Sequence, residues 1–211
     1  MKKSLTIILL LLAATAATTA YSQDTITYYY TAEWKKATVN DSWTYYRKAY
    51  KENGQWIAND YYKSGKLQMT GTYKSILTEQ KHGLFTYYYE NGCKKAEGLF
   101  NRNIIDGEWK EWDDRGNLKV INTFAFNLIV DQKIYYENGT LQLHATFRNG
   151  REHGHWQYFD YNGLLIYEGN FSNGKKQGLW TRYFPDSPAM TQTFVRGKLR
   201  ENMGLGMVIE D

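Results

Sequence analysis

Apolar and polar residues alternate over short stretches that recur through most of the chain. In residues 140–147 the apolar or small positions are Leu141, Leu143, Ala145 and Phe147, and the positions between them are polar. The same alternation occurs in residues 66–73 and 117–124. A period of two residues is typical of a β-strand with one buried face. The pattern therefore predicts a series of half-buried strands.

A second, aromatic strand precedes each of these strands, and a turn joins the two. The aromatic stretches are residues 85–89, 109–112, 134–136, 156–159 and 180–184. Aromatic and β-branched residues favour strands. The turns include Asn91-Gly92 and Asn138-Gly139, and Asn-Gly is a strong hairpin signal because both residues tolerate positive φ. Further Asn-Gly turns at 149–150 and 173–174 separate the units, so that each unit has two strands and two turns.

Two independent markers show that these hairpins are repeats. Both recur every 23–24 residues after a first step of 27. The turn positions are Gly65, Gly92, Gly116, Gly139, Gly163 and Ser187, and the closing aromatic residues are Tyr73, Phe100, Phe124, Phe147, Phe171 and Phe194. The wider first step predicts an insertion in a loop at residues 75–78. We therefore predict an all-β fold of five or six tandem hairpin repeats that form an elongated, twisted antiparallel sheet.

One position in each unit stays small, and it predicts how the rings pack. This position is Gly71, Gly98, Ala145 or Gly169 in four of the units. A small residue there is expected if a large ring from a neighbouring strand lies across it. We expect the closing residues Phe100, Phe124, Phe147 and Phe171 to be interior, and Cys93, which follows a turn glycine, to be dispensable.

The repeated phrase resembles the MORN repeat variant over roughly residues 54–194. The phrase combines Gly with an aromatic residue, a Tyr pair, Asn-Gly and a final Gly-x-Phe, and one copy runs from His82-Gly83-Leu84-Phe85 through Asn91-Gly92 to Gly98-Leu99-Phe100. It recurs at Asp106-Gly107-Glu108-Trp109, His153-Gly154-His155-Trp156 and Gln177-Gly178-Leu179-Trp180. One unit departs, because Asp131 replaces the glycine and Gln132 replaces the ring.

Such repeats are found in bacterial proteins described as the YwqK type of toxin-antitoxin system antitoxin component. The resemblance implies a stack of hairpins that forms an elongated sheet or groove used for protein or membrane contact. It also implies an antitoxin-like binder as one possible function.

The ends of the chain differ from the repeats. Residues 1–22 begin with Lys2 and Lys3, continue through a short apolar run, and end in small residues, which is the order of a secretory signal peptide. Cleavage is expected after Ala20 or Ser22. The apolar run falls short of the roughly 20 residues of a membrane helix, so no membrane span is expected in the mature chain. We predict an N-terminal β cap at 23–53, repeats at 54–194 and a C-terminal cap or tail at 195–211, in a periplasmic or extracellular protein.

Composition narrows the partner class. The chain has 26 Lys and Arg against 22 Asp and Glu, and removal of Lys2 and Lys3 leaves 24 against 22, a net charge of +2. The cations are interspersed with acids, which argues against nucleic-acid binding. A single cysteine allows no internal disulfide. Aromatic residues make up 17% of the chain and are the expected packing material.

No constellation points to catalysis, a cofactor or a metal. His82 and His153 each precede a repeat glycine and suit a turn. His153 and His155 lack the further ligands that a metal site needs. The acid pairs Asp113-Asp114 and Glu108/Glu111 suit a solvated strand edge. The sequence therefore favours a non-enzyme that uses no cofactor.

The candidate binding residues lie just before the turns. We expect Tyr88, Trp112, Tyr135, Phe159 and Tyr183 to be core rings, and alternation should place their neighbours on an outer face. These neighbours are Tyr87, Tyr89, Glu111, Asp113, Tyr136, Tyr158, Asp160 and Arg182. They form either a partner-binding surface or an inert solvated face.

The sequence favours a repeat scaffold or binding module of the bacterial cell envelope that contacts a protein or peptide. The alternatives are a glycan-binding or carbohydrate-active protein that uses an aromatic ladder, and the antitoxin-like binder implied by the resemblance.

Overall fold

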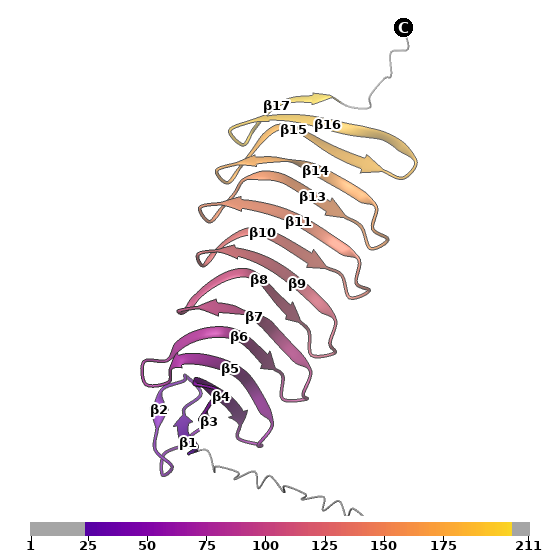
Figure 1. Ribbon diagram of the computed structural model, residues 1–211. Helices are drawn as coiled ribbons and strands as arrows, with labels where there is room; N and C mark the ends of the chain where they lie inside the picture. Colours follow the sequence, from indigo (N-terminus) through magenta and orange to yellow (C-terminus); the bar gives the residue numbers. More distant parts are fainter. Residues whose placement is uncertain (1–23, 204–211) are drawn as a thin grey trace, which may run out of the picture.

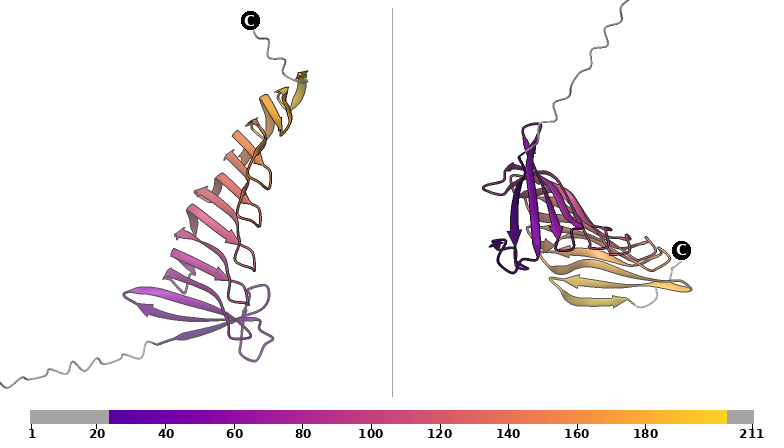
Figure 2. Two further views of the ribbon diagram at one scale, coloured as in Figure 1. Left: turned by 90° about the vertical axis from the view of Figure 1, so that its right-hand side faces the viewer. Right: turned by 90° about the horizontal axis from the view of Figure 1, so that it is seen from below.

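The protein is a single open sheet of antiparallel strands. The computed structural model describes residues 24–203, which contain seventeen strands and no helix, and so no helix that could cross a membrane. The strands stack like rungs into an elongated, twisted ladder (Figure 1), and the sheet of repeats is one layer thick (Figure 2). This confirms the predicted all-β fold of tandem hairpins. The predicted signal peptide at 1–22 lies outside the described residues.

Nearly every strand pairs with the next one along the chain. The strands are β1 (Ile26–Tyr30), β2 (Lys36–Ala37), β3 (Tyr45–Glu52), β4 (Gln55–Tyr62), β5 (Leu67–Ser75), β6 (Gln80–Tyr88), β7 (Lys94–Asn101), β8 (Ile104–Trp112), β9 (Leu118–Ala125), β10 (Leu128–Tyr135), β11 (Leu141–Arg148), β12 (Arg151–Glu152), β13 (Gly154–Phe159), β14 (Leu165–Ser172), β15 (Lys175–Phe184), β16 (Ser187–Val195) and β17 (Lys198–Met203). At the N-terminal end β1 pairs with both β2 and β3, and β11 pairs with both β12 and β13.

The turns between units are two-residue turns in which both residues have positive φ. Asn149 and Gly150 have φ values of 51° and 71°. Positive φ at both positions defines the hairpin turn whose twist matches that of the strands. The expectation for Asn-Gly is confirmed at these turns.

The turns within units are of a different type, and the expectation of two positive φ values is wrong there. Only the glycine has positive φ, as at Gly92 (92°), whose N–H donates to the Tyr89 carbonyl at 2.9 Å. A register shift follows in the paired strands at Tyr87/Tyr88. This is a type I turn closed by a bulged glycine. The Asn91 side chain instead accepts a hydrogen bond from the Cys93 N–H at 2.9 Å.

The long first repeat contains the predicted loop insertion. Residues 76–79 form a turn between β5 and β6 that is longer than the two-residue turns between later units. Ile76 in this loop is buried. The Tyr30 hydroxyl donates to Glu79 at 3.2 Å, so the loop is tied to the N-terminal strand β1.

The core rings lie directly on glycines of the preceding strand. A Cβ atom added to Gly71 would come within 2.3 Å of Phe85, and one added to Gly169 within 2.2 Å of Trp180. Gly98 has the same relation to Trp109. Phe85 and Trp180 are fully buried, although the sheet has no second layer above them. The predicted packing of a ring across a small residue is confirmed.

These rings share one side of the sheet, which we call the ring face. In successive hairpins it carries Phe85, Trp109, Gln132, Trp156 and Trp180, as the cross-strand pairs show. The rings form one cluster around Phe85 and another around Trp156 and Trp180. Between the two clusters the Gln132 amide donates to the Asn122 side chain at 2.8 Å, so the departing unit places a polar contact where the others have a ring.

The closing aromatic residues support the clusters without being interior themselves. Phe100 packs against the first cluster, and Phe147 and Phe171 pack against the second, but all three are half-buried. The expectation that these residues are interior is therefore wrong: they contact the core but are only half-buried. A one-layer sheet leaves the outer side of these rings in contact with water.

An ion pair is buried in the first hairpin. The Arg47 guanidinium donates to the two carboxylate oxygens of Asp60 at 2.6 and 2.9 Å and lies over the rings of Tyr30 and Tyr73. Both charged residues are buried. Burial raises the pKa of the Asp60 carboxyl, and the Arg47 guanidinium opposes this rise.

Replacing a fully buried ring should cost more stability than replacing a half-buried one. Trp180→Ala should lower the free energy of unfolding by about 3–5 kcal/mol, because the ring is fully buried. Phe147→Ala should cost only about 2 kcal/mol, because its ring is already partly exposed to water. Urea denaturation followed by tryptophan fluorescence or circular dichroism measures both, with Cys93→Ser as a nearly neutral control. An equal cost for Trp180 and Phe147 would contradict this assignment of the core.

Candidate binding surface

The structure places the candidate binding residues differently from the sequence-based expectation. The core rings are Phe85, Trp109, Trp156 and Trp180, three residues before the expected rings. A shift by an odd number of residues exchanges the two faces of a strand. The assignment of Tyr88, Trp112, Tyr135, Phe159 and Tyr183 to the core was therefore wrong.

Four of the eight candidates lie on the ring face. They are Tyr87, Glu111, Tyr158 and Arg182, each two residues beyond a core ring. The ring centroids of Phe85 and Tyr87 are 6.5 Å apart, and Tyr87 packs against the first cluster. Tyr158 packs against the second cluster. The expectation that these two tyrosines lie away from the core was wrong.

The other four candidates close the turns. The Tyr89 hydroxyl donates to the Trp112 carbonyl at 2.9 Å, and the Tyr136 hydroxyl donates to the Phe159 carbonyl at 2.9 Å. Each acceptor is the last residue of the strand before the next hairpin's turn, 23 residues further along the chain. These two tyrosines therefore tie adjacent repeats together.

Aspartate at the same position closes its own turn. One carboxylate oxygen of Asp113 accepts hydrogen bonds from the N–H groups of Arg115 and Asn117 at 3.0 and 2.8 Å. In the hairpin formed by β13 and β14, the Asp160 carboxylate accepts hydrogen bonds from the N–H groups of Asn162 and Leu164 in the same way. Hydrogen bonds led by that from the Asn117 side chain lower the pKa of the Asp113 carboxyl. The choice of Tyr or Asp before the turn was visible in the sequence, but its two structural roles were not inferred from it.

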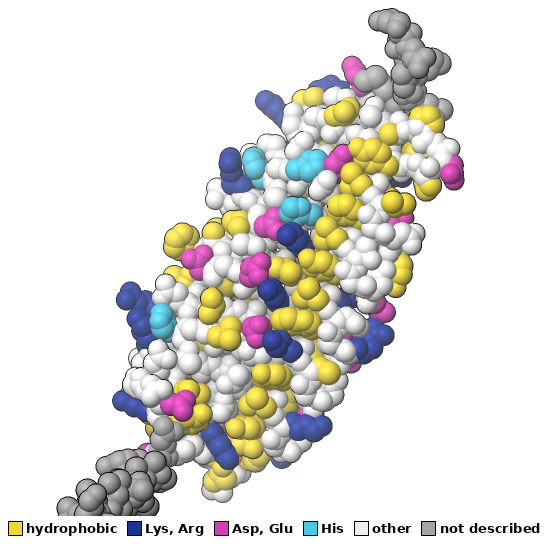
Figure 3. Space-filling model, turned by 45° about the vertical axis from the view of Figure 1, so that its right-hand side comes forward, with side chains coloured by type: hydrophobic (Ala, Val, Ile, Leu, Met, Phe, Trp, Pro, Cys, Tyr) yellow, Lys and Arg dark blue, Asp and Glu magenta, His cyan; other side chains and the backbone are white. Residues whose placement is uncertain are grey.

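The face opposite the ring face carries a line of polar side chains. Cross-strand pairing connects Glu97 to Lys110 and, further along, Lys133 to His144. The His144 imidazole lies 2.6 Å from the Asp131 carboxylate. In Figure 3 a line of charged and His side chains follows the long axis of one side of the molecule, beside a stripe of hydrophobic side chains.

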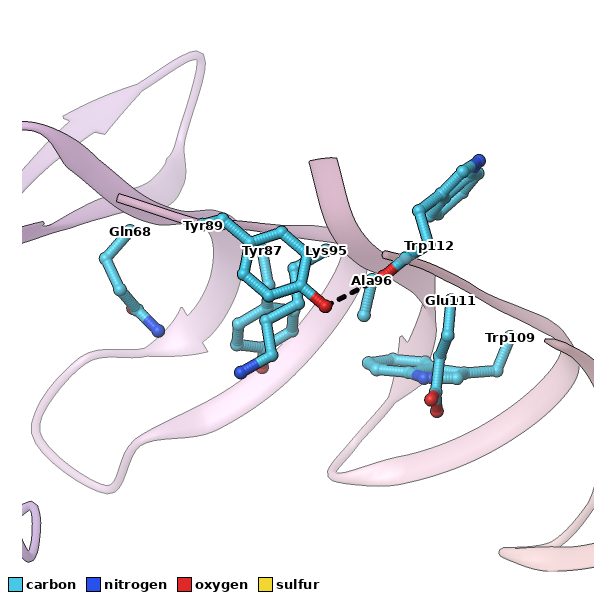
Figure 4. Close-up of a pocket in the computed structure, with 8 residues that line it drawn as sticks. All are labelled: Gln68, Tyr87, Tyr89, Lys95, Ala96, Trp109, Glu111 and Trp112. Atoms are coloured by element: carbon cyan, nitrogen blue, oxygen red, sulfur yellow. Dashed lines mark hydrogen bonds between the residues drawn. The ribbon is translucent and has the colours of Figure 1, made fainter. Parts of the chain in front are cut away.

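A hollow interrupts the ring face between β6 and β8. Its volume is about 270 Å³, and Ala96 of β7 lies between Tyr87 on one side and Glu111 on the other (Figure 4). We call it the Ala96 hollow. It is lined by Gln68, Tyr87, Tyr89, Lys95, Ala96, Trp109, Glu111 and Trp112. It thus brings together three of the sequence-predicted candidates: Tyr87, Tyr89 and Glu111.

The hollow exists because one repeat has a small residue in a row of larger ones. Ala96 is the fourth residue after its turn glycine. The same position in the other repeats holds Met69, Val120, Leu143 and Tyr167. The sequence displayed this difference, but only the cross-strand register shows that the missing side-chain volume faces Tyr87 and Glu111.

The charges at the hollow are not paired with one another. Glu111 is exposed, and within residues 24–203 its carboxylate forms no ion pair or hydrogen bond. The Lys95 ammonium lies 5.5 Å from the centre of the Tyr89 ring, on the opposite wall (Figure 4). The hollow therefore offers aromatic surface together with an uncompensated carboxylate.

Comparison with known families gives a match to the hairpins. The MORN repeat variant matches residues 57–75, 81–101, 105–125, 130–149 and 152–173. Each matched segment corresponds to one pair of strands joined by a turn with a bulged glycine, beginning with β4–β5. No curated protein matches the chain.

The tyrosine ties between repeats predict a measurable loss of stability. Tyr89→Phe and Tyr136→Phe should each lower the free energy of unfolding by about 0.5–1.5 kcal/mol, because each removes one hydrogen bond to the next turn. Tyr161→Phe is the matched control, since this exposed ring lies tilted against Tyr136 and its hydroxyl makes no hydrogen bond in the described residues. Equal melting temperatures for Tyr89→Phe and Tyr161→Phe would show that the tie contributes nothing.

Proposed function

The chain carries five MORN repeat variants, and from this premise we propose that it is a non-catalytic binding module that holds a protein or peptide partner on its ring face. The Ala96 hollow is the observation that supports the proposal. Interfaces are stabilised mainly by a few side chains that fill desolvated pockets, and Tyr, Trp and Arg predominate among them. A hollow of about 270 Å³ with Tyr87 and Trp109 in its lining has room for one such side chain.

The proposed location is the bacterial cell envelope or the exterior. The order of residues 1–22, with cations, a short apolar run and small residues, supports export. A toxin bound by an antitoxin-like protein would be one case of a protein partner on the same surface.

A glycan is the second candidate ligand, and a row of rings that meets the hollow only at Trp112 favours it. Tyr88, Trp112, Tyr135, Phe159 and Tyr183 recur once per hairpin and are all half-buried. Neighbouring hairpins are separated by about 10 Å, twice the spacing of paired strands. A regular row of rings at this interval suits an extended polysaccharide.

Filling the hollow should weaken partner binding without damaging the fold. Ala96→Leu places in this repeat the side chain that another repeat has at Leu143, so the fold should be retained. Val120→Leu is the matched control, because Val120 pairs with Glu111 in the same row but does not line the hollow. A partner captured from an envelope extract by the wild-type protein should bind Ala96→Leu at least about tenfold more weakly, a loss of about 1.4 kcal/mol, and Val120→Leu unchanged.

The measurement is calorimetric titration with the purified partner, after both variants have been shown to be folded by circular dichroism. Unchanged binding of every captured protein to Ala96→Leu would rule out the hollow as the binding site. Retention of a soluble polysaccharide by the wild-type protein, with loss in Tyr135→Ala, would favour the glycan candidate instead, because Tyr135 belongs to the row of rings but does not line the hollow. Hydrolysis of any such polysaccharide would contradict a non-catalytic function.

A further inference from the structure

In one cross-strand row of the ring face, the two side chains of a pair suit one another: acid with base, cation with ring, or apolar side chain with ring. In β3–β4 the pair is Arg47 and Asp60, which form a buried ion pair. In β14–β15 the pair is Tyr167 and Arg182, whose guanidinium lies 5.4 Å from the centre of the ring. Two further pairs in the row are Met69 with Tyr87 and Leu143 with Tyr158.

The pair at the hollow is the exception among these. Ala96 pairs with Glu111, so a methyl group faces a carboxylate. Glu111 occupies in its hairpin the position that Asp60 occupies in the first, five residues before the turn glycine. Ala96 accordingly occupies the position of Arg47. The repeat has retained the acid and lacks the base.

One ring at this position, Trp109, also lacks a cation that other rings have. The Arg47 guanidinium covers Tyr30 and Tyr73, and the Lys176 ammonium lies 4.3 Å from the centre of the Trp180 ring. The other rings of the hollow each have a lysine: Lys81 lies 5.8 Å from the centre of Tyr87, Lys95 5.5 Å from that of Tyr89 and Lys94 5.1 Å from that of Trp112. Within the described residues no Lys or Arg lies over Trp109. Cations are attracted to aromatic faces, most strongly to that of Trp.

A further group in the hollow lacks a hydrogen-bond partner. The side-chain carbonyl oxygen of Gln68 is buried, and it accepts no hydrogen bond within the described residues. A buried acceptor left unpaired costs free energy that a donor from a ligand would recover. A guanidinium carries five N–H donors and no acceptor, so the Gln68 oxygen and the Glu111 carboxylate are each a group that could accept from it.

We propose that the Ala96 hollow binds an arginine side chain of the partner, which takes the place that Arg47 has beside Asp60. This inference rests on the proposed function, because it names the side chain that enters the hollow. The Glu111 carboxylate pairs with the guanidinium, which stacks on the face of Trp109. Arginine suits such a site better than lysine, since its planar group both stacks on rings and pairs with a carboxylate.

Lys95 adjusts the affinity of the site. Its ammonium on the wall opposite Glu111 repels an incoming guanidinium and lies over the Tyr89 ring. Removal of this charge should therefore strengthen arginine binding, whereas a purely structural role of Lys95 would not.

The test uses a blocked pentapeptide with one central arginine and four glycines as the probe. Titration into the mature protein, followed by the NMR signal of the Trp109 indole N–H, should show saturable binding. The same peptide with norleucine in place of arginine should not bind. Glu111→Gln should weaken arginine binding at least about tenfold, and Lys95→Gln should strengthen it roughly threefold.

Two results would overturn the proposal: equal binding of the arginine and norleucine peptides, or undiminished binding of the arginine peptide to Glu111→Gln. A lysine peptide that binds as tightly as the arginine peptide would overturn the assignment of a guanidinium. These results are independent of partner capture by Ala96→Leu. If Ala96→Leu loses the partner while Glu111→Gln keeps its affinity for the arginine peptide, the binding module stands and the arginine inference fails.

Discussion

The packing of an aromatic ring onto a glycine of the preceding strand is the contact on which this structure depends. A sheet of one layer has no second layer against which to bury its side chains. Here the ring of Trp180 lies flat against the backbone at Gly169, and the absence of a Cβ atom lets it come that close. The result is a fully buried tryptophan in a sheet that is open on both sides. The same contact also fixes the register of neighbouring strands, because each ring must meet a small residue one strand earlier.

Contacts beyond this shared one differ from repeat to repeat. The middle of the array replaces a ring with the hydrogen bond between Gln132 and Asn122, and this separates the two aromatic clusters. The N-terminal end adds the buried pair of Arg47 and Asp60. Breaking such a pair usually leaves a buried unpaired charge, which costs stability. The pair therefore favours the one strand register at this end of the array that keeps Arg47 beside Asp60. Side chains at these positions can vary without disturbing the ring-on-glycine contact, so they are free to form a binding site.

The Ala96 hollow is an example of such variation. A smaller side chain at one position of one row creates a cavity and leaves Glu111 without a partner. Replacing a larger residue by Ala at a packed position ordinarily costs stability. A repeat protein tolerates the loss because each hairpin contacts mainly its neighbours, so the effect stays local. A binding site can thus arise in one repeat without changing the others.

The sequence by itself determined the strands, their pairing order and the length of the repeat, because period-two alternation and turn residues are local signals. It also identified Gly71, Gly98 and Gly169 as the positions that lie beneath rings. Only the tertiary structure decided which aromatic residues face the core. Tyr87 and Tyr88 are both aromatic, so composition does not distinguish the faces, and the bulge after each turn glycine shifts the register by one residue. Finding the hollow also required the strand register. Ala96 and Glu111 are fifteen residues apart in the chain and become neighbours only through the pairing of β7 with β8.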